Sequence, residues 1–418
     1  MQRSLVLCIA IALTASLVLA ESAAYDQYGG WKKLRGKKTG YFHTQQIRGR
    51  WWLVTPDGYV FFSKGVCHVA FSREASSSPA EPSDRAAWSK ATAQQLKGWN
   101  FNTVGNWSYP EMFKTGLAYA PAINIAGTAA RDARAEGLIP DYFSPEFRET
   151  ADRVAKQMCA ARARDPWLLG YFTDNELAWT HNEIAWSPNP PWNLPESLLG
   201  LYLKMPEQSA GRRKANQYMK TRGLIEGTLT EDDKNGFAEV VATEYARVCR
   251  DAIRRYDPNH MILGCRFAGH APEPILRGIA PYVDVVSFNN YHPRPPLWKL
   301  QQLTDVTGKP IMITEFSFKA MDSGLPNTLG AAAPVATQQD RADGFDQYVR
   351  DLAALPSCVG YHWFEYRDEP KEGRGGDGEN SNYGLVKIDG ALWEVLTTRM
   401  TQVNSEIESL AAKAAKRP

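Results

Sequence analysis

Eight short apolar runs, spread over most of the chain and separated by longer polar segments, constrain the fold more than any other sequence feature. An apolar run of this length, bounded by turn residues, is typical of a β-strand that is buried on both faces. The eight expected strands are residues 65–69, 103–106, 119–123, 168–172, 262–266, 283–288, 311–316 and 359–364.

Helical patterns between these strands indicate crossover connections. Ser144-Pro145-Glu146 supplies an N-cap, a proline at the first helical position and an acid in the first turn. Apolar faces with helical spacing cover residues 147–158, 237–253 and 345–352. Eight strands joined in this way predict an α/β fold of the (β/α)8 (TIM) barrel type. An open doubly wound sheet is disfavoured because the chain carries neither a glycine-rich dinucleotide fingerprint nor a phosphate-binding P-loop, so we also expect no cofactor.

The sequence before the first barrel strand predicts an export signal and a hairpin. Arg3 precedes an apolar run that ends in small residues, as in a cleaved signal peptide over residues 1–20. Residues 50–62 predict two strands around a Pro56-Asp57-Gly58 turn. We therefore expect a lead-in and hairpin over 21–60, one catalytic barrel over 61–400 and a C-terminal helix or tail over 401–418. Residues 179–236 predict an elaborated loop with short helices after the fourth strand.

Composition and charge narrow the class of partner. Lys plus Arg number 48 and Asp plus Glu 46, and no long basic run is present, so we expect no nucleic-acid partner. No stretch reaches the ~20 apolar residues that span a bilayer, so an exported chain of this kind is secreted or periplasmic. Nothing in the composition specifies an oligomeric state.

Cysteines and histidines indicate no metal site. Cys8 lies in the expected signal, and the five remaining cysteines lack the even number and short spacing of a disulfide framework, although one disulfide remains possible. Several lie in strand-like runs, where a free cysteine is usually a small core residue. The seven histidines show no His-x-x-x-His spacing.

Polar and aromatic residues follow the C-terminal ends of the expected strands, where barrel enzymes build their active sites. Glu176 closes the fourth strand and Glu315 the seventh. A single acid there is more often a helix cap or a surface residue. Two carboxylates facing each other across a cleft are what glycosidic cleavage requires. The candidate substrate-binding residues at the same strand ends are His68, Asn106, Asn175, Arg266, Asn289, Tyr291, Trp363 and Glu365.

Two of these residues fit a retaining mechanism. Asn175 directly precedes Glu176, and an asparagine can bind the sugar 2-hydroxyl. Tyr291 follows the sixth strand, and we expect its phenol within hydrogen-bond reach of Glu315. The loop over residues 373–379 lacks the ligand spacing of a calcium site and is expected to lie over the cleft.

Asn-Glu after strand four and Glu after strand seven resemble clan A of the glycoside hydrolases. Residues 30–382 are more specifically similar to glycoside hydrolase family 50, the β-agarases. The similar stretches are Gly49–Val54, Pro56–Gly58, Phe61–Ser63, Gly98–Thr103, Phe172–Leu177, Asp257–His260, Asp284–Asn289, Thr314–Phe316, His362–Asp368 and Asp377–Asn380.

The resemblance implies that Glu176 is the acid/base and Glu315 the nucleophile. Members of this family usually carry a β-sandwich before the barrel, and the segment between the expected signal and the hairpin is too short for one. The function expected is a retaining β-glycoside hydrolase that cleaves agar-type polysaccharide or its shorter oligosaccharides. The alternatives are another clan A activity, namely a β-galactosidase, β-glucanase or β-mannanase, and a carbohydrate-binding barrel without catalysis.

Overall fold

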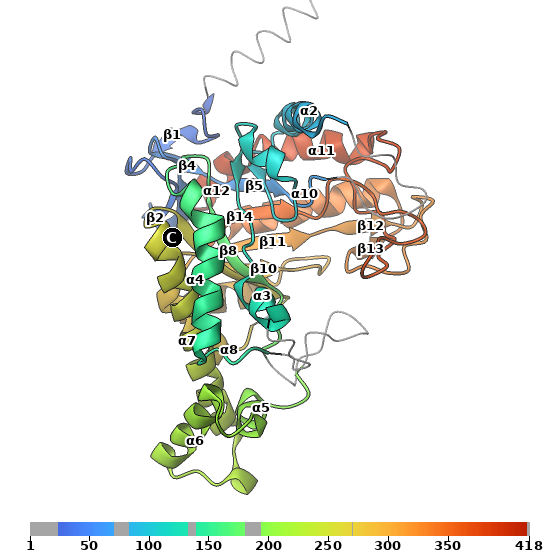
Figure 1. Cartoon of the computed structure of the whole chain (residues 1–418). Coiled ribbons are helices and arrows are strands. Elements are labelled where there is room, and N and C mark those ends of the chain that lie inside the picture. The colour runs from blue at the N-terminus through green and yellow to red at the C-terminus, as the bar shows by residue number, and fades with distance from the viewer. Residues whose placement is uncertain (1–23, 71–82, 133–138, 180–193, 270, 416–418) are drawn as a thin grey trace, which may run out of the picture.

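The computed structural model describes residues 24–70, 83–132, 139–179, 194–269 and 271–415 (Figure 1). The expected signal peptide over residues 1–20 lies outside the described residues. Among the described residues, no helix is both long enough and apolar enough to cross a membrane.

A four-stranded antiparallel sheet at the N-terminal end precedes the main sheet. Its strands lie in the order β1 (Trp31–Arg35), β4 (Tyr59–Phe61), β3 (Arg50–Val54) and β2 (His43–Ile47). The predicted hairpin is confirmed as β3 and β4, with Gly58 at φ 86° in the turn between them. β1 and β2 come from the segment that the sequence shows only as a polar lead-in.

The main sheet has eight parallel strands in the order β7-β6-β5-β14-β11-β10-β9-β8. Parallel bridges from Tyr119 to Leu168 and from Ala122 to Phe172 join its two edges, so the sheet is nearly closed and compatible with a TIM-like barrel. Each expected strand has its counterpart. In chain order these are β5 (Ser63–Val66), β6 (Thr103–Val104), β7 (Ala118–Tyr119), β8 (Gly170–Asn175), β9 (Met261–Ala268), β10 (Val286–Asn289), β11 (Ile311–Phe316) and β14 (Cys358–Trp363).

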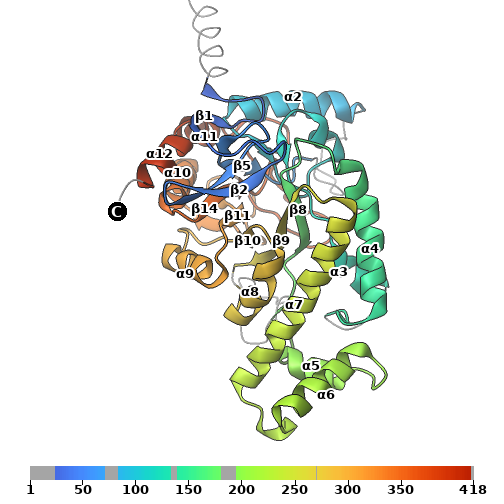
Figure 2. The ribbon, with the colours of Figure 1, turned by 90° about the vertical axis from the view of Figure 1, so that its left-hand side faces the viewer.

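Helices pack around this sheet (Figure 2). α4 (Pro145–Cys159) begins where the sequence predicts, because the Ser144 side chain accepts a hydrogen bond from the Phe147 amide. α10 (Gln338–Ala354) buries the predicted face. The remaining barrel helices are α2 (Arg85–Gly98), α3 (Ile125–Asp132), α8 (Glu273–Ile279), α9 (Leu297–Thr307), α11 (Glu394–Asn404) and α12 (Ile407–Ala414). A short parallel pair, β12 (Phe318–Ala320) and β13 (Ala333–Val335), follows β11.

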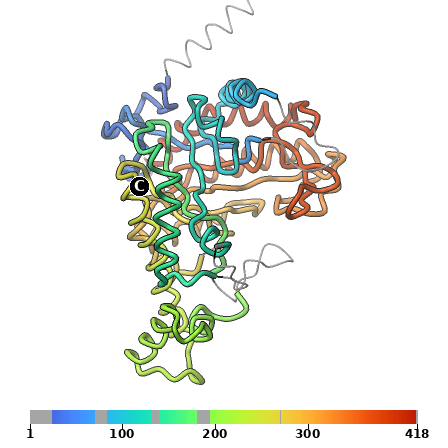
Figure 3. The backbone as a smooth tube through the Cα atoms, viewed as in Figure 1, coloured from blue at the N-terminus to red at the C-terminus, as the bar shows by residue number. Residues whose placement is uncertain are grey.

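The connection after β8 carries the predicted short helices, α5 (Leu198–Lys204) and α6 (Ala210–Arg222). They lie with the first turns of α7 (Glu231–Tyr256) in a projection from the barrel (Figure 3). One boundary prediction is wrong: residues 231–236 belong to α7 and not to the loop. Thr230 and Asp233 form a capping box, which stabilises this polar start of the helix. Residues 180–193 of the expected loop lie outside the described residues.

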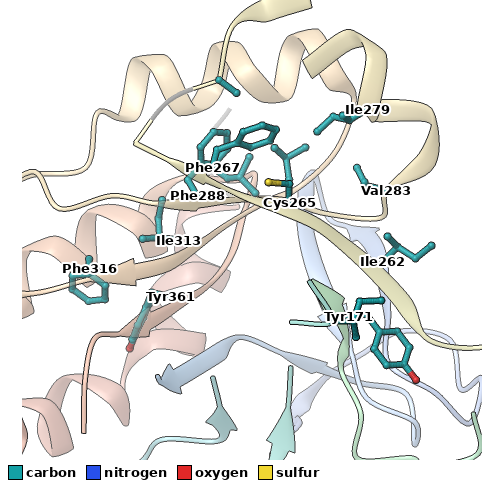
Figure 4. Close-up of a cluster of buried hydrophobic side chains, with 14 of the residues drawn as sticks. Tyr171, Ile262, Cys265, Phe267, Ile279, Val283, Phe288, Ile313, Phe316 and Tyr361 are labelled. Atoms are coloured by element: carbon teal, nitrogen blue, oxygen red, sulfur yellow. The ribbon is translucent and has the colours of Figure 1, made fainter. Parts of the chain in front are cut away.

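Two apolar layers hold the barrel together. Side chains such as Ile262, Phe288 and Phe316 point outward from the strands and pack against the helices (Figure 4). Alternate strand residues form a second cluster, which also takes in Phe42 and Leu53 of the N-terminal sheet. The described cysteines, Cys67, Cys159, Cys249, Cys265 and Cys358, are free and buried.

Candidate active site

Backbone strain is concentrated where the first four barrel strands end. Among the described residues, seven non-glycine residues have positive φ, and four of them follow β5, β6, β7 and β8 in turn. These are His68 at 47°, Trp107 at 64°, Asn124 at 53° and Glu176 at 49°. Non-glycine residues adopt this conformation rarely, and such residues cluster at functional sites. The strain therefore marks the same barrel face as the candidate carboxylates.

Glu176 is partly exposed at the end of β8. Its Oε1 accepts a hydrogen bond of 2.8 Å from Asn289 Nδ2. Withdrawal of the carboxyl from water, followed by the negative charge of Glu315, raises the pKa of Glu176 to about 7. A carboxyl with such a pKa is partly protonated near neutral pH and is able to act as a general acid.

Glu315 is 5% exposed at the end of β11 and is held by three donors. Arg266 Nη2 lies 2.6 Å from Oε1, and Trp107 Nε1 donates to the same oxygen at 3.1 Å. The Tyr291 hydroxyl donates to Oε2 at 2.8 Å, which confirms the predicted contact. Donors to both oxygens fix the orientation of the Glu315 carboxyl, which a nucleophile needs for attack at a defined atom.

A hydrogen-bond network connects the two carboxyls. Arg266 Nη1 donates to Asn175 Oδ1 at 3.0 Å, and Asn289 Nδ2 lies 3.1 Å from the same oxygen. Asn289 also donates to Glu176, while Arg266 bonds Glu315. Side chains from β8, β9, β10 and β11 therefore meet in one polar layer.

A second group of acids lies beside this layer, where β5 and β14 end. Glu365 contacts His68 Nδ1, and Arg374 Nη1 lies 2.8 Å from Glu369 Oε1. Burial raises the pKa of Glu365 to about 8 and, with the charge of Glu365, that of Glu369 to about 9. Arg374 also pairs with Glu379 at 3.0 Å.

The geometry of this group suits a metal ion only in part. His68, Glu365 and Glu369 each offer a ligand atom, and these atoms lie within 4.8 Å of one another. The Arg374 guanidinium, however, already supplies a positive charge to both carboxyls, at 3.8 Å from Glu365 and 2.8 Å from Glu369. A divalent cation would have to displace it, so the residues fit an internal ion-pair cluster better than a metal centre.

Other predicted residues take different places. Asn106 is buried, with Oδ1 accepting from the Ala122 amide at 2.8 Å and Nδ2 lacking a hydrogen-bond partner among the described residues. For Trp363 the structure argues against a sugar contact. The side chain is 0% exposed, its Nε1 donates to Tyr383 O, and its ring packs near the Arg341 guanidinium. Phe345 of α10 packs against the same ring, so the Trp363 side chain is enclosed by protein.

Sequence reasoning missed some members of the site. Arg374, Glu369 and Glu379 come from the loop after β14, and only their acidic and glycine-rich composition marked that segment. Trp107 is not among the predicted site residues, yet its indole NH bonds Glu315 while the side chain remains 41% exposed. Asp174, which precedes Asn175 on β8, has a structural role instead. Its side chain accepts hydrogen bonds from the amides of Ala126 and Gly127 and so caps α3.

Comparison with known proteins finds similarity to agarases. No family model matches the sequence. The chain is 29% identical to β-agarase B of Vibrio sp. (strain JT0107) in an alignment of 494 residues. This alignment covers 92% of this chain and 50% of that protein. It is 27% identical to β-agarase A of the same strain over 356 residues, or 76% of this chain and 36% of the relative. The chain thus spans about half the length, or less, of these relatives.

Solved structures of an agarase and of a related protein are also similar to this chain. The agarase AgWH50C superposes with a TM-score of 0.78 at 26% identity, over 95% of this chain and 69% of that chain. BpGH50 gives a TM-score of 0.78 at 22% identity, over 94% of this chain and 87% of its own. The chain is therefore similar in sequence to β-agarases and similar in structure to an agarase and to proteins of glycoside hydrolase family 50.

Proposed function

We propose that this protein is a retaining β-glycoside hydrolase that cleaves β-linked galactose units of agar-type polysaccharide or its oligosaccharides. The observation that carries the proposal is the placement of Glu176 and Glu315, at the ends of β8 and β11, in one hydrogen-bond network. The similarity to β-agarases supports the choice of substrate.

The reaction assigns a different task to each carboxyl. Glu315 attacks the anomeric carbon while Glu176 gives its proton to the departing glycosidic oxygen, so that a glycosyl ester forms as the C–O bond breaks. Water then attacks the same carbon, Glu176 takes the proton of that water, and the ester bond to Glu315 breaks. The donors around Glu315 and the raised pKa of Glu176 suit these tasks.

The further site assignments belong to the same proposal. Asn175 is proposed to bind the sugar 2-hydroxyl, and the clan A resemblance supports its position before the acid/base. His68, Asn106, Asn289 and Glu365 are proposed to bind other hydroxyls. Asn106 Nδ2 has no hydrogen-bond partner among the described residues, which leaves a donor for such a contact. The exposed indole of Trp107 offers a flat face for a sugar ring.

The same proposal covers the domain organisation and the location of the protein. We take the nearly closed sheet as a (β/α)8 barrel, with the catalytic domain over residues 61–400. Residues 1–20 are proposed to be a cleaved signal, which implies a secreted or periplasmic enzyme.

The test pairs two variants with two leaving groups. Glu176→Ala should slow hydrolysis of agaro-oligosaccharides most and spare glycosylation by aryl β-galactosides with good leaving groups, because only poor leaving groups need the proton. Glu315→Ala should abolish turnover of both, and azide should restore it only with inverted product configuration, read by NMR. Near-normal activity in either variant would remove that glutamate from the mechanism.

Assays of wild-type protein on a panel of agarose, β-glucan and β-mannan separate the alternative functions. Cleavage of β-glucan or β-mannan in place of agarose would assign another glycosidase activity. Binding of agarose without cleavage of any panel member would assign a binding protein.

A further inference from the structure

Arg266 occupies an unusual position for a charged residue. It lies within the apolar strand β9, and its side chain is 0% exposed. Its guanidinium is flanked by the rings of Phe172 and Trp107, at 5.3 and 5.9 Å from the ring centroids. A buried charge is costly unless it is paired and hydrogen-bonded, so its partners indicate why it is there.

Those partners belong to both candidate carboxyls. Nη2 bonds Glu315 Oε1 at 2.6 Å and the Thr314 carbonyl at 2.8 Å, while Nη1 bonds Asn175 Oδ1 at 3.0 Å. Asn175 directly precedes Glu176 in the chain. One planar group thus fixes the nucleophile directly and the acid/base through its neighbour, which a single ammonium cannot do.

We infer that Arg266 is a positioning residue that sets the relative placement of Glu176 and Glu315 and compensates the charge of the nucleophile. The inference rests on the proposed function. It assigns to Arg266 a role different from the sugar contact expected from the sequence, because both Nη groups already bond protein acceptors.

The charge on Glu315 has several neighbours, and Arg266 is distinct among them. Trp107 and Tyr291 are neutral donors to its oxygens. The titratable and charged groups that face it from the surrounding elements are Cys67 after β5, Glu176 after β8, Arg266 on β9, Tyr291 after β10, Glu365 after β14 and Glu379 on the following loop. Of these, Arg266 alone is a cation.

A second buried arginine offers a matched control. Arg50 is 1% exposed and lies between the rings of Trp52 and Phe62, at 5.2 and 5.7 Å. Its Nη1 and Nη2 donate to the backbone carbonyls of Ala353 and Cys358, at the opposite end of the barrel strands. Substituting Arg50 therefore removes a similar buried guanidinium without touching a candidate carboxyl.

The experiment compares Arg266→Lys, Arg266→Met, Arg50→Lys and wild-type protein. Thermal unfolding checks that each is folded, and kcat/KM is measured from pH 4 to 9 on an aryl β-galactoside and on agaro-oligosaccharides. Loss of one preorganised electrostatic contact typically lowers the rate by ~10²–10³-fold, and we expect this of Arg266→Met on both substrates. Arg266→Lys keeps the positive charge but not the two-pronged geometry, so it should restore part of the rate that Arg266→Met loses, with the main effect on kcat.

The outcomes separate this inference from the proposed function. If wild-type protein cleaves no galactan, the proposed function fails, and the inference fails with it. If wild-type protein is active and folded Arg266→Met keeps its rate on both substrates, the inference alone is overturned. If Arg266→Met does not fold, Arg266→Lys decides: a rate loss on both substrates that Arg50→Lys lacks supports positioning, and equal rates overturn it.

Discussion

The hydrogen bond from Asn289 to Glu176 gives a direct way to shift the pH dependence of the reaction. The amide stabilises the charged form of the Glu176 carboxyl and so lowers its pKa, against the larger effects of burial and of the Glu315 charge. The net pKa of about 7 predicts a basic limb near that pH for substrates with poor leaving groups, because above it Glu176 has no proton to donate.

Asn289→Leu removes this donor while approximately preserving side-chain volume. A hydrogen bond to a charged group contributes ~1.5–3 kcal/mol. One pKa unit corresponds to ~1.4 kcal/mol. Since Glu176 is partly exposed and water can replace the donor, we take the lower end and expect an upward shift of about one unit. Thr314, which donates to Asn289 Oδ1, also donates to the Phe288 carbonyl and keeps that partner.

The assay is kcat/KM on agaro-oligosaccharides from pH 5 to 9, with an aryl β-galactoside bearing a good leaving group as a second substrate. The basic limb should move upward for the first substrate and be weak or missing for the second. Asn102→Leu is the control, because its amide donates to the Phe62 carbonyl, before the start of β5. A limb that stays in place or moves to lower pH in folded Asn289→Leu would refute the assignment of Glu176 as the acid.

Three stability predictions follow from buried groups. Burial raises the folded-state pKa of Glu365 to about 8, so its contribution is fully present below the unfolded-state pKa and is lost as pH rises through about 8. The Tm should fall between pH 5 and 8, and Glu365→Gln should reduce that fall; an equally steep fall would contradict this. Lys64 Nζ and Glu408 Oε1 lie 2.7 Å apart in a buried pair. Glu408→Leu should lower the free energy of unfolding by ~3–5 kcal/mol in urea titration. The double variant with Lys64→Met should lose less, and an equal or larger loss would argue against the pair. Phe316 stacks on Tyr348 at 4.4 Å, and Phe316→Ala should cost ~3–5 kcal/mol by the same measurement. A loss below ~1 kcal/mol would show that the site relaxes.

The barrel strands were predictable because burial on both faces leaves a direct trace in the sequence. Residues 311–316 match β11, and the other expected strands overlap their observed counterparts. β1 and β2 left no such trace. Their residues are mostly half-buried or exposed, and they are strands because they pair with β4 and β3. β1 depends on β4, a partner that lies beyond β2 and β3 in the chain. β2 is joined to β3 by the tight turn Arg48-Gly49, but its polar residues give no apolar alternation that would mark a strand.

The site was predictable as far as barrel topology determines it. Parallel strands bring their C-terminal ends to one face, so Glu176 and Glu315 were expected together without knowledge of any contact. The hydrogen bond from Arg266 to Glu315 and the contact of Arg374 with Glu365 were not predictable. Each depends on how side chains from separate connections pack together. Arg266 within the apolar run of β9 nonetheless indicated an ion pair, since a buried cation there requires an anionic partner.

The two ends of the barrel differ in where buried charges and strained backbone conformations lie. At the N-terminal end, Arg50 donates to two backbone carbonyls and Lys64 is paired with Glu408. At the C-terminal end, four strands in succession terminate in strained residues. Buried polar atoms without a partner among the described residues occur at both ends, for example Asn106 Nδ2 and Arg50 Nε. A fold tolerates such features where function requires them and compensates elsewhere. Because the four strained residues lie on the face that holds both glutamates, they support a site at which function determines the backbone conformation.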